Sequence, residues 1–284
     1  MELAFRRWGE KPGPIPSKKL VLLHGMGGTG SLWRPVAATL EDDFEILAPD
    51  QRGHGGSRIA EVAGSRKRPG FSPLDYAQDV ADTLEALHFH PATVIGHSLG
   101  ARTACALAQL RPDRVERLVL VDLGFDGLAG GGLGEGLARF IRILPERFAS
   151  RAEARAFMDQ NCPDGSMAQY LMAVSVALPE DAGGGIGFPF DHSALLRTLE
   201  EARGTSIRHW VESAALKGIP VLALRGSLSR VWTREEFEAE VRHFSDLKWK
   251  GRVRLHQIEG AGHGLPFEKR PEFVAELRKF ISET

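Results

Sequence analysis

Short apolar runs recur along the chain, separated by longer stretches in which apolar residues return at helical spacing. The runs are rich in Val, Ile and Leu, as expected for strands that are buried on both faces. Six runs predict strands: Lys18–Leu23, Phe44–Ala48, Ala92–Ile95, Arg117–Val121, Ile219–Leu224 and Val253–Ile258.

The stretches between these runs predict helices. The alanine-rich stretch 98–110 ends before Pro112, and the stretch 267–281 carries an apolar stripe near the end of the chain. A further stripe is formed by residues at helical spacing, namely Tyr76, Val80, Leu84 and Leu87. Because strands alternate with helices, we expect an α/β domain with a mostly parallel sheet.

The alternation stops between about Gly124 and Arg208. This stretch contains glycine-rich patches and helix-like pieces: Gly130–Gly136, Arg139–Leu144, Ala152–Asp159, Met167–Leu178 and Gly183–Gly187. We therefore predict a core domain of residues 1–124 and 213–284, with a helical cap at 125–212 inserted over one end of the sheet. The alternative is two ordinary crossover helices with long loops.

Composition narrows the function classes. Lys and Arg number 36 against 37 Asp and Glu, so the net charge of -1 provides no field to attract polyanions, and we expect no nucleic-acid partner. The two cysteines, Cys105 and Cys162, exclude a disulfide framework and favour a reducing compartment.

The first residues resemble no signal peptide, and no apolar run approaches the roughly 18 residues of a membrane span. We expect a soluble, cytoplasmic protein without a membrane partner; its oligomeric state is not indicated.

The sharpest chemical signal is Gly96-His97-Ser98-Leu99-Gly100, which follows a predicted strand and opens a predicted helix. Strand, tight turn and helix are the setting of a nucleophile elbow, in which small flanking residues let strand and helix approach closely. The pattern predicts Ser98 as a catalytic nucleophile. The alternative is a serine with a structural role in the turn.

A serine hydroxyl needs a neighbouring base to become a good nucleophile. His263 stands in Gly260-Ala261-Gly262-His263-Gly264, directly after the last predicted strand and before the last helix. The flanking glycines would let this loop bend toward the elbow, so we predict His263 as the base. The alternative is a loop histidine that caps a helix.

The first core strand leads into His24-Gly25-Met26-Gly27-Gly28. Acyl transfer requires two N–H donors for the oxyanion, and the backbone N–H groups of Met26 and Leu99 form the predicted pair. His24 and Gly25 are predicted to support this loop. His54 is predicted to pack within its own loop, and His97, which lies inside the elbow, is predicted to be buried.

The same loop also satisfies G-x-G-x-x-G at Gly25–Gly30, with Asp50 about 20 residues on. That spacing is typical of a dinucleotide-binding oxidoreductase, the rival hypothesis. The dinucleotide hypothesis does not explain the nucleophile elbow or the Gly-His-Gly motif near the end of the chain. It also places Trp33 and Pro35 in the first helical turn, where small residues usually face the phosphate. No H-E-x-x-H, C-x-x-C or carboxylate cluster suggests a metal, so we predict no metal.

With these motifs in hand, the chain resembles an α/β-hydrolase over residues 1–124 and about 213–284. The motifs, in order, are HGMGG at His24–Gly28, DQRGHGGS at Asp50–Ser57, GHSLG at Gly96–Gly100 and GAGHG at Gly260–Gly264. The resemblance implies an eight-stranded, mostly parallel sheet flanked by helices, a helical cap after the sixth strand, and no cofactor.

Most relatives of this type carry the catalytic acid shortly after the glycine that ends the seventh strand. Here that segment is Gly226-Ser227-Leu228-Ser229-Arg230, which has no carboxylate. Some small bacterial esterases instead place the acid after the sixth strand, where this chain has Asp122. The resemblance therefore implies Asp122 as the third triad member, with a loop-anchoring Asp as the alternative.

The resemblance implies a serine hydrolase that cleaves carboxylic esters of small or medium acyl groups through an acyl-enzyme. Thioesterase, lactonase, perhydrolase and C–C hydrolase chemistry use the same triad, and a receptor-like binding protein is the alternative of another class. The partner is a small ester or acyl substrate. Apolar cap residues are expected to line its pocket: Phe140, Leu144, Leu171, Met172 and Phe188.

Overall fold

The computed structural model describes residues 1–10, 18–58, 69–126 and 132–283. Within these residues the central sheet has seven strands, in the order β1-β3-β2-β4-β5-β9-β10, where the resemblance implied eight. All neighbouring pairs are parallel except β1 with β3. The strands are β1 (Phe5–Trp8), β2 (Lys18–Leu23), β3 (Phe44–Pro49), β4 (Ala92–His97), β5 (Val115–Val121), β9 (Val221–Gly226) and β10 (Val253–Ile258).

The six strands predicted from apolar runs are confirmed; the bounds of β2 and β10 are as predicted, and those of the other four differ by one or two residues. The strand β1 was not predicted. It lies at the edge of the sheet, and its sequence, Phe-Arg-Arg-Trp, has two exposed arginines at its centre instead of a continuous apolar run. Edge strands often carry charge, which weakens the hydrophobic signal that identifies central strands.

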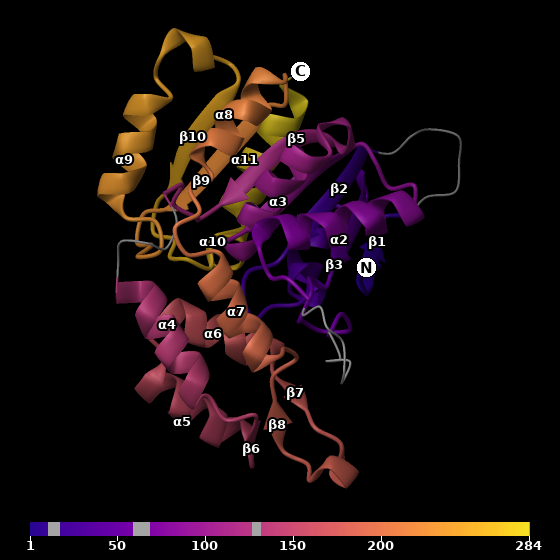
Figure 1. Cartoon of the computed structure of the whole chain (residues 1–284), viewed down its shortest axis with the longest axis vertical. Coiled ribbons are helices and arrows are strands. Elements are labelled where there is room, and N and C mark those ends of the chain that lie inside the picture. Colours follow the sequence, from indigo (N-terminus) through magenta and orange to yellow (C-terminus); the bar gives the residue numbers. More distant parts are fainter. Residues whose placement is uncertain (11–17, 59–68, 127–131, 284) are drawn as a thin grey trace.

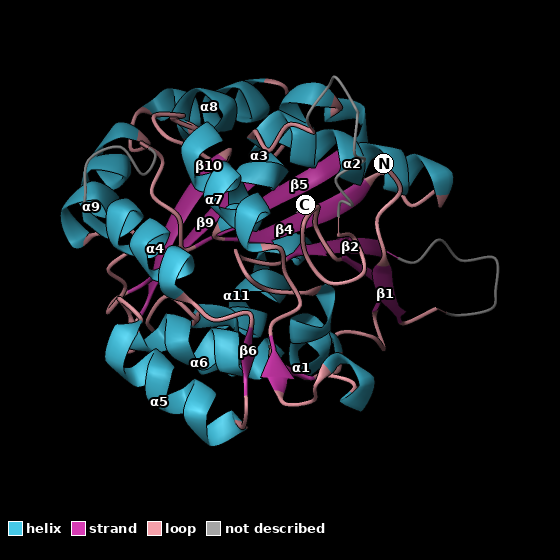
Figure 2. Ribbon diagram, turned by 60° about the horizontal axis from the view of Figure 1, so that its bottom comes forward, coloured by secondary structure: helices cyan, strands magenta, loops and turns pink. Residues whose placement is uncertain are grey.

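Helices cover both faces of the sheet (Figure 2). One face packs against α2 (Pro73–Ala86), α3 (Leu99–Leu110), α8 (Arg208–Leu216) and α9 (Arg234–His243). The other packs against α1 (Arg34–Ala37), α10 (Leu265–Glu268) and α11 (Arg270–Ser282). Short 3-10 helices lie at Gly30–Trp33, Pro112–Arg114, Glu180–Ala182 and Leu247–Trp249. The chain therefore has the α/β-hydrolase fold, a mostly parallel sheet between two layers of helices.

The segment between β5 and α8 forms its own group at one end of the molecule (Figure 1). It contains α4 (Gly132–Ile143), α5 (Arg151–Asn161), α6 (Gly165–Val174) and α7 (His192–Glu201), with a small sheet of β6 (Arg147–Phe148), β8 (Ile186–Gly187) and β7 (Val176–Ala177). These helices follow β5, the fifth sheet strand along the described chain, whereas the resemblance placed the insertion after a sixth. Part of the predicted glycine patch Gly130–Gly136 begins α4, and residues 127–131 lie outside the description. The domain limits 125–212 stay a prediction.

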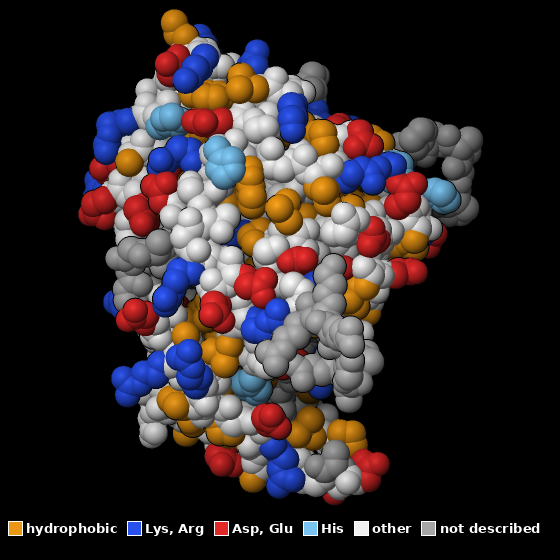
Figure 3. Space-filling model, viewed as in Figure 1, with side chains coloured by type: hydrophobic (Ala, Val, Ile, Leu, Met, Phe, Trp, Pro, Cys, Tyr) orange, Lys and Arg blue, Asp and Glu red, His pale blue; other side chains and the backbone are white. Residues whose placement is uncertain are grey.

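Basic and acidic side chains are interspersed over the face shown in Figure 3, as the near-zero net charge implies. Across the described ranges, no helix combines the length and apolar character needed to cross a membrane.

Candidate active site

Ser98 occupies the sharp turn between β4 and α3. Its φ and ψ are 53° and -113°, a conformation that side-chain-bearing residues rarely adopt and that costs free energy. Its N–H donates to the Val121 carbonyl at 2.9 Å. A Cβ added to Gly96 would lie 2.1 Å from the Gly100 oxygen, and one added to Gly100 would lie 2.3 Å from the Leu23 oxygen. Glycine is therefore required at both positions for this strand–turn–helix geometry.

Asp122 follows the last residue of β5 and faces the loop that carries His263. The Asp122 Oδ2 atom lies 2.7 Å from His263 Nδ1, and Asp122 Oδ1 accepts a hydrogen bond from the Gly226 N–H at 2.9 Å. Asp122 is fully buried, and its backbone also has a positive φ, of 51°. An ionised carboxylate only accepts hydrogen bonds, so this contact places a proton on Nδ1 and leaves Nε2 as the basic nitrogen of a neutral His263.

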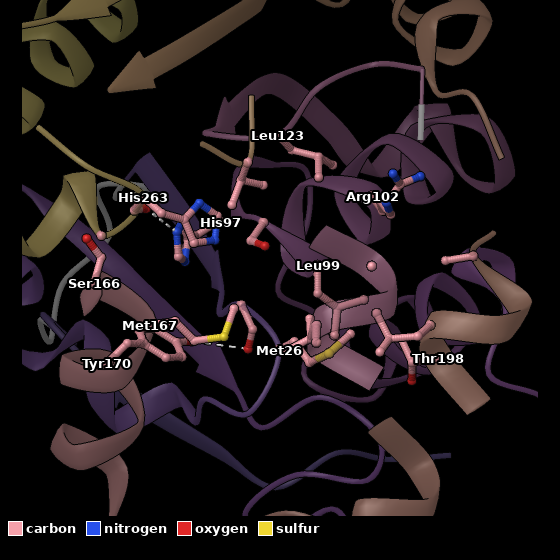
Figure 4. A pocket seen from close by; sticks show the side chains of 18 residues that line it. Met26, His97, Leu99, Arg102, Leu123, Ser166, Met167, Tyr170, Thr198 and His263 are labelled. Atoms are coloured by element: carbon pink, nitrogen blue, oxygen red, sulfur yellow. Dashed lines mark hydrogen bonds between the residues drawn. The ribbon is translucent and has the colours of Figure 1, made fainter. Parts of the chain in front are cut away.

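Ser98 and His263 line the same pocket, which is partly open to solvent. Figure 4 shows His263 and His97 at one side of this pocket and Arg102 at the other. The structure thus gathers Ser98, His263 and Asp122 at the carboxyl ends of β4, β10 and β5, as the sequence predicted for their positions. The lining consists of Gly25, Met26, His97, Ser98, Leu99, Arg102, Leu123, Gly134, Leu137, Ser166, Met167, Tyr170, Thr198, Leu199, Ala202, Val231, His263 and Gly264.

Two residues that line this pocket have backbone N–H groups without a hydrogen-bond partner in the described residues. The described chain supplies no hydrogen-bond acceptor to the N–H of Met26 or of Leu99. Gly25 brings the loop against the elbow, because a Cβ added there would lie 3.3 Å from Ser98 Cβ. The predicted pair of oxyanion donors therefore lies on the two segments that flank Ser98.

Two buried histidines hold the Met26 loop in place. His24 Nε2 accepts from the Gln51 N–H at 2.9 Å, and His54 Nε2 accepts from the Gly27 N–H at 3.0 Å. Burial lowers the pKa of His24 well below 6.5, and it lowers the pKa of His54 to about 4. Both rings are therefore neutral at pH 7 and serve as fixed acceptors.

His97 lies beneath His263, with ring centroids 4.7 Å apart. Its Nε2 is 2.8 Å from the His263 carbonyl oxygen, so His97 fixes the backbone of the loop that carries the predicted base. Burial, and then the proximity of His263, lower the pKa of His97 to about 3. A neutral His97 donates from Nε2 and adds no positive charge beside His263.

The dinucleotide-like glycine pattern has a different use in the structure. The Gly30 N–H donates to Asp50 Oδ1 at 2.7 Å, and the Gly56 N–H donates to Asp50 Oδ2 at 2.9 Å. Asp50 is buried and joins two loops. The dinucleotide-binding hypothesis required it instead to face the ribose of a bound dinucleotide. Trp33 is also fully buried in the core. This loop instead presents Met26 to the pocket of Ser98.

The predicted pocket residues of the cap need correction. They pack with one another in the hydrophobic cluster of the cap and are absent from the pocket lining: Phe140, Leu144, Leu171, Met172 and Phe188. The pocket is lined instead by adjacent positions on the same helices, Leu137 of α4 and Met167 and Tyr170 of α6.

Three residues with polar contacts at the site were missed. Ser229 donates its hydroxyl hydrogen bond to Asp122 Oδ2, Tyr170 donates to the Gly25 carbonyl at 3.1 Å, and Arg102 enters the pocket lining. Ser229 lies in the segment Gly226–Arg230, in which the sequence analysis looked for a catalytic acid and found none. The position of this segment beside the site was the one signal in the sequence that could have pointed to Ser229. Tyr170 and Arg102 lie on helices whose orientation the sequence does not specify.

The described residues contain no group of three or more His, Cys, Asp or Glu side chains arranged to hold a metal ion. The two cysteines are both free, Cys105 being buried and Cys162 partly so.

The sequence matches the alpha/beta hydrolase family over residues 20–277. The chain belongs to this family. Esterase YbfF of Escherichia coli (strain K12) is 26% identical over 264 residues, which cover 93% of this chain and 93% of that protein.

Solved structures agree on the alpha/beta hydrolase fold. A marine microorganism esterase superposes with a TM-score of 0.75 at 21% identity, covering 98% of this chain and 99% of its own. E-2-(acetamidomethylene)succinate hydrolase superposes with a TM-score of 0.76 at 21% identity, covering 98% of this chain and 94% of its own.

Proposed function

We propose that this protein is a serine hydrolase that cleaves carboxylic esters through an acyl-enzyme. The observation that carries the proposal is the 2.7 Å contact between His263 and the buried Asp122, at the pocket that Ser98 enters on a strained turn. Family membership and the esterase names of YbfF and of the marine enzyme add support.

In the proposed reaction, Ser98 Oγ attacks the ester carbonyl while His263 Nε2 takes its proton. The N–H groups of Met26 and Leu99 donate to the oxygen that becomes negative in the tetrahedral intermediate. His263 returns the proton to the departing alcohol, which leaves Ser98 acylated. Water then attacks the acyl-enzyme, again losing a proton to His263, and the acid departs as Ser98 regains its hydrogen.

Asp122 has two tasks in this scheme. It keeps the His263 proton on Nδ1, so that Nε2 is the basic nitrogen, and it stabilises the imidazolium that forms when Nε2 is protonated. Its full burial strengthens the second effect, because water does not screen the interaction.

The substrate we propose is a small ester with a small or medium acyl group. Thioesters and lactones react through the same steps, and structural neighbours include a thioesterase domain and an enol-lactonase. We also propose a reducing compartment, the cytoplasm, since the cysteines are both free.

The test is covalent labelling combined with turnover. A fluorophosphonate probe should label the wild-type protein at Ser98, and Ser98→Ala should remove both labelling and hydrolysis of p-nitrophenyl butyrate. Loss of a triad nucleophile typically lowers kcat by about a million-fold. Near-native turnover by Ser98→Ala would refute the proposal. A labelled wild-type protein that stops after about one turnover would instead favour the receptor-like alternative.

A further inference from the structure

Arg102 is a charged side chain in the lining of the apolar pocket. It stands four residues after Ser98, in the first turn of α3, and both residues line the pocket. Figure 4 shows Arg102 across the pocket from His263. Only 2% of its surface is exposed to solvent.

The guanidinium of Arg102 is incompletely satisfied. Nη1 donates to the Thr205 carbonyl at 2.8 Å, whereas Nη2 is buried and has no hydrogen-bond partner in the described part of the chain. Thr198, which lines the same end of the pocket, uses its hydroxyl on Tyr76 and on the Ala194 carbonyl. It therefore has little capacity left for Arg102.

No carboxylate of the described residues forms an ion pair with Arg102. The undescribed residues 127–131, which precede α4, are Gly, Leu and Ala, and the one acidic side chain outside the description is Glu61. Burial lowers the pKa of Arg102 to about 10, so the group keeps its charge at pH 7. Burial raises the pKa of the nearby Cys105 thiol, which is therefore neutral and supplies no counter-charge.

A buried cation without a counter-ion is costly, and proteins usually pair such groups. Leucines form much of the lining around Arg102, namely Leu99, Leu123, Leu137 and Leu199. An anion of the ligand would supply both the charge and the hydrogen-bond acceptor that this end of the pocket lacks. Guanidinium groups bind carboxylates with well-matched geometry through parallel N–H donors.

We propose that Arg102 binds a carboxylate on the substrate, so that the preferred substrates are esters carrying a second, ionised carboxyl group. This inference rests on the proposed ester hydrolysis and deepens it by naming the substrate class. Arg102 touches the substrate in this scheme and determines specificity. It takes no part in the proton transfers at Ser98 and His263.

The experiment compares charged esters with capped, neutral counterparts in two arms. The first arm uses p-nitrophenyl hemiesters of succinate, glutarate and adipate against the same compounds capped as methyl esters. The second uses the butyryl ester of 4-hydroxybenzoate against that of methyl 4-hydroxybenzoate. The arms distinguish a carboxylate on the acyl side from one on the alcohol side.

For the wild-type protein we expect kcat/KM to favour the charged member of at least one pair by about tenfold or more, as for hydrogen bonds to charged groups. Arg102→Met should abolish or reverse this preference, measured as the ratio of kcat/KM within each pair, and Arg102→Lys should retain part of it. Arg234→Met is the matched control, because Arg234 is exposed on α9 and pairs with Glu238. It should retain the wild-type preference.

A binding measurement separates this inference from the proposed function and needs no turnover. Calorimetry should detect pentanoate but not pentanamide on the wild-type protein, and Arg102→Met should lose pentanoate binding.

Two results would overturn the role of Arg102 and leave the proposed function standing. In the first, ester turnover depends on Ser98 but shows no preference for a carboxylate in either arm. In the second, the preference survives in Arg102→Met. If no ester is cleaved and Ser98 is not labelled, the proposed function fails, while Arg102-dependent pentanoate binding would still uphold the carboxylate site. Should Arg102→Met not fold, a wild-type protein that favours the capped esters and ignores pentanoate still refutes the inference.

Discussion

Ser229 and Asp122 come from the ends of neighbouring strands, β9 and β5, and share a hydrogen bond at the site. The Ser229 hydroxyl donates to Asp122 Oδ2, the same oxygen that lies 2.7 Å from His263 Nδ1. With the Gly226 N–H on Oδ1, the carboxylate is held at both oxygens. The segment that follows β9, in which the sequence analysis found no carboxylate, thus holds the carboxylate of Asp122 in the direction in which it faces His263.

Asp122→Asn should lower kcat by about 10⁴-fold if the triad scheme holds, because the amide no longer selects the reactive tautomer of His263. The measurement is steady-state hydrolysis of p-nitrophenyl butyrate, with circular dichroism to show that the variant is folded. Glu235→Gln and Glu236→Gln are the comparison, since these acids lie on α9, and each should change kcat less than about tenfold. If Asp122→Asn stays active while the Glu235 or the Glu236 variant is inactive, the catalytic acid lies on α9 and not at Asp122.

Ser229→Ala should have a smaller effect than Asp122→Asn. It removes one of the hydrogen bonds that orient the carboxylate but leaves the Gly226 N–H and the His263 contact in place. A neutral donor to a charged acceptor contributes about 1.5–3 kcal/mol, so kcat should fall by roughly 10- to 100-fold. KM should change little because Ser229 is not among the pocket-lining residues. Rescue by Ser229→Thr, which keeps the hydroxyl, would distinguish loss of the donor from loss of packing; failure of both variants would point to packing.

Much of the core could be predicted because its signals are local. Runs such as Val21–Leu23 and Val119–Val121 are apolar on both faces and identify buried strands without any tertiary information. Ser98 carries its own signal, since Gly96 and Gly100 are needed for close contact within the turn itself. His263 and Asp122 followed from the rule that parallel strands end at one edge of a sheet and from the resemblance to a known family.

The cap could not be predicted to the same depth. Helical periodicity identifies the apolar stripe that runs along α4 to Leu144. Leu137, Phe140 and Leu144 all pack in or against the cluster within the cap, yet only Leu137 of the three also lines the pocket. Which side of an amphipathic helix faces a ligand depends on how the helices pack, and that information is not local. Arg102 was missed for a similar reason, because nothing in the sequence shows that an arginine on α3 is buried without a counter-ion.

The acyl preference should respond to Leu137 and not to Leu144. Longer neutral acyl chains should raise kcat/KM from acetyl upward, by up to about fourfold for each buried methylene, until the pocket is full. Leu137→Phe adds volume to the lining and should shift the optimum to a shorter chain. Leu144→Ala should instead destabilise the protein, by about 2–5 kcal/mol, and leave the order of chain lengths unchanged. A series of p-nitrophenyl esters from acetate to decanoate measures the optimum, and a preference for acetate over all longer chains would contradict this view of the pocket.

Three buried histidines should make the protein acid-sensitive in a defined pH range. Burial lowers the pKa of His54 to about 4 and that of His97 to about 3, and it lowers the pKa of His24 well below 6.5. In the unfolded chain each should titrate near 6.5. Between about pH 6.5 and the folded-state values, the unfolded state therefore binds protons that the native state does not, and the free energy of unfolding falls as the pH drops.

His54 alone should account for about 2 kcal/mol of the stability lost between pH 7.5 and pH 5, and its full contribution is present only above pH 6.5. His54→Gln keeps an acceptor for the Gly27 N–H but removes the titrating ring. We therefore expect this variant to lose about 2 kcal/mol less than the wild-type protein over the same interval. Urea unfolding at pH 7.5, 6.5, 5.5 and 5.0 measures the difference, and the value at pH 7.5 separates the effect of the lost imidazole contacts from that of titration. An equal loss in both proteins would mean that His54 titrates in the native state as it does in the unfolded chain, which its burial and its two backbone contacts argue against.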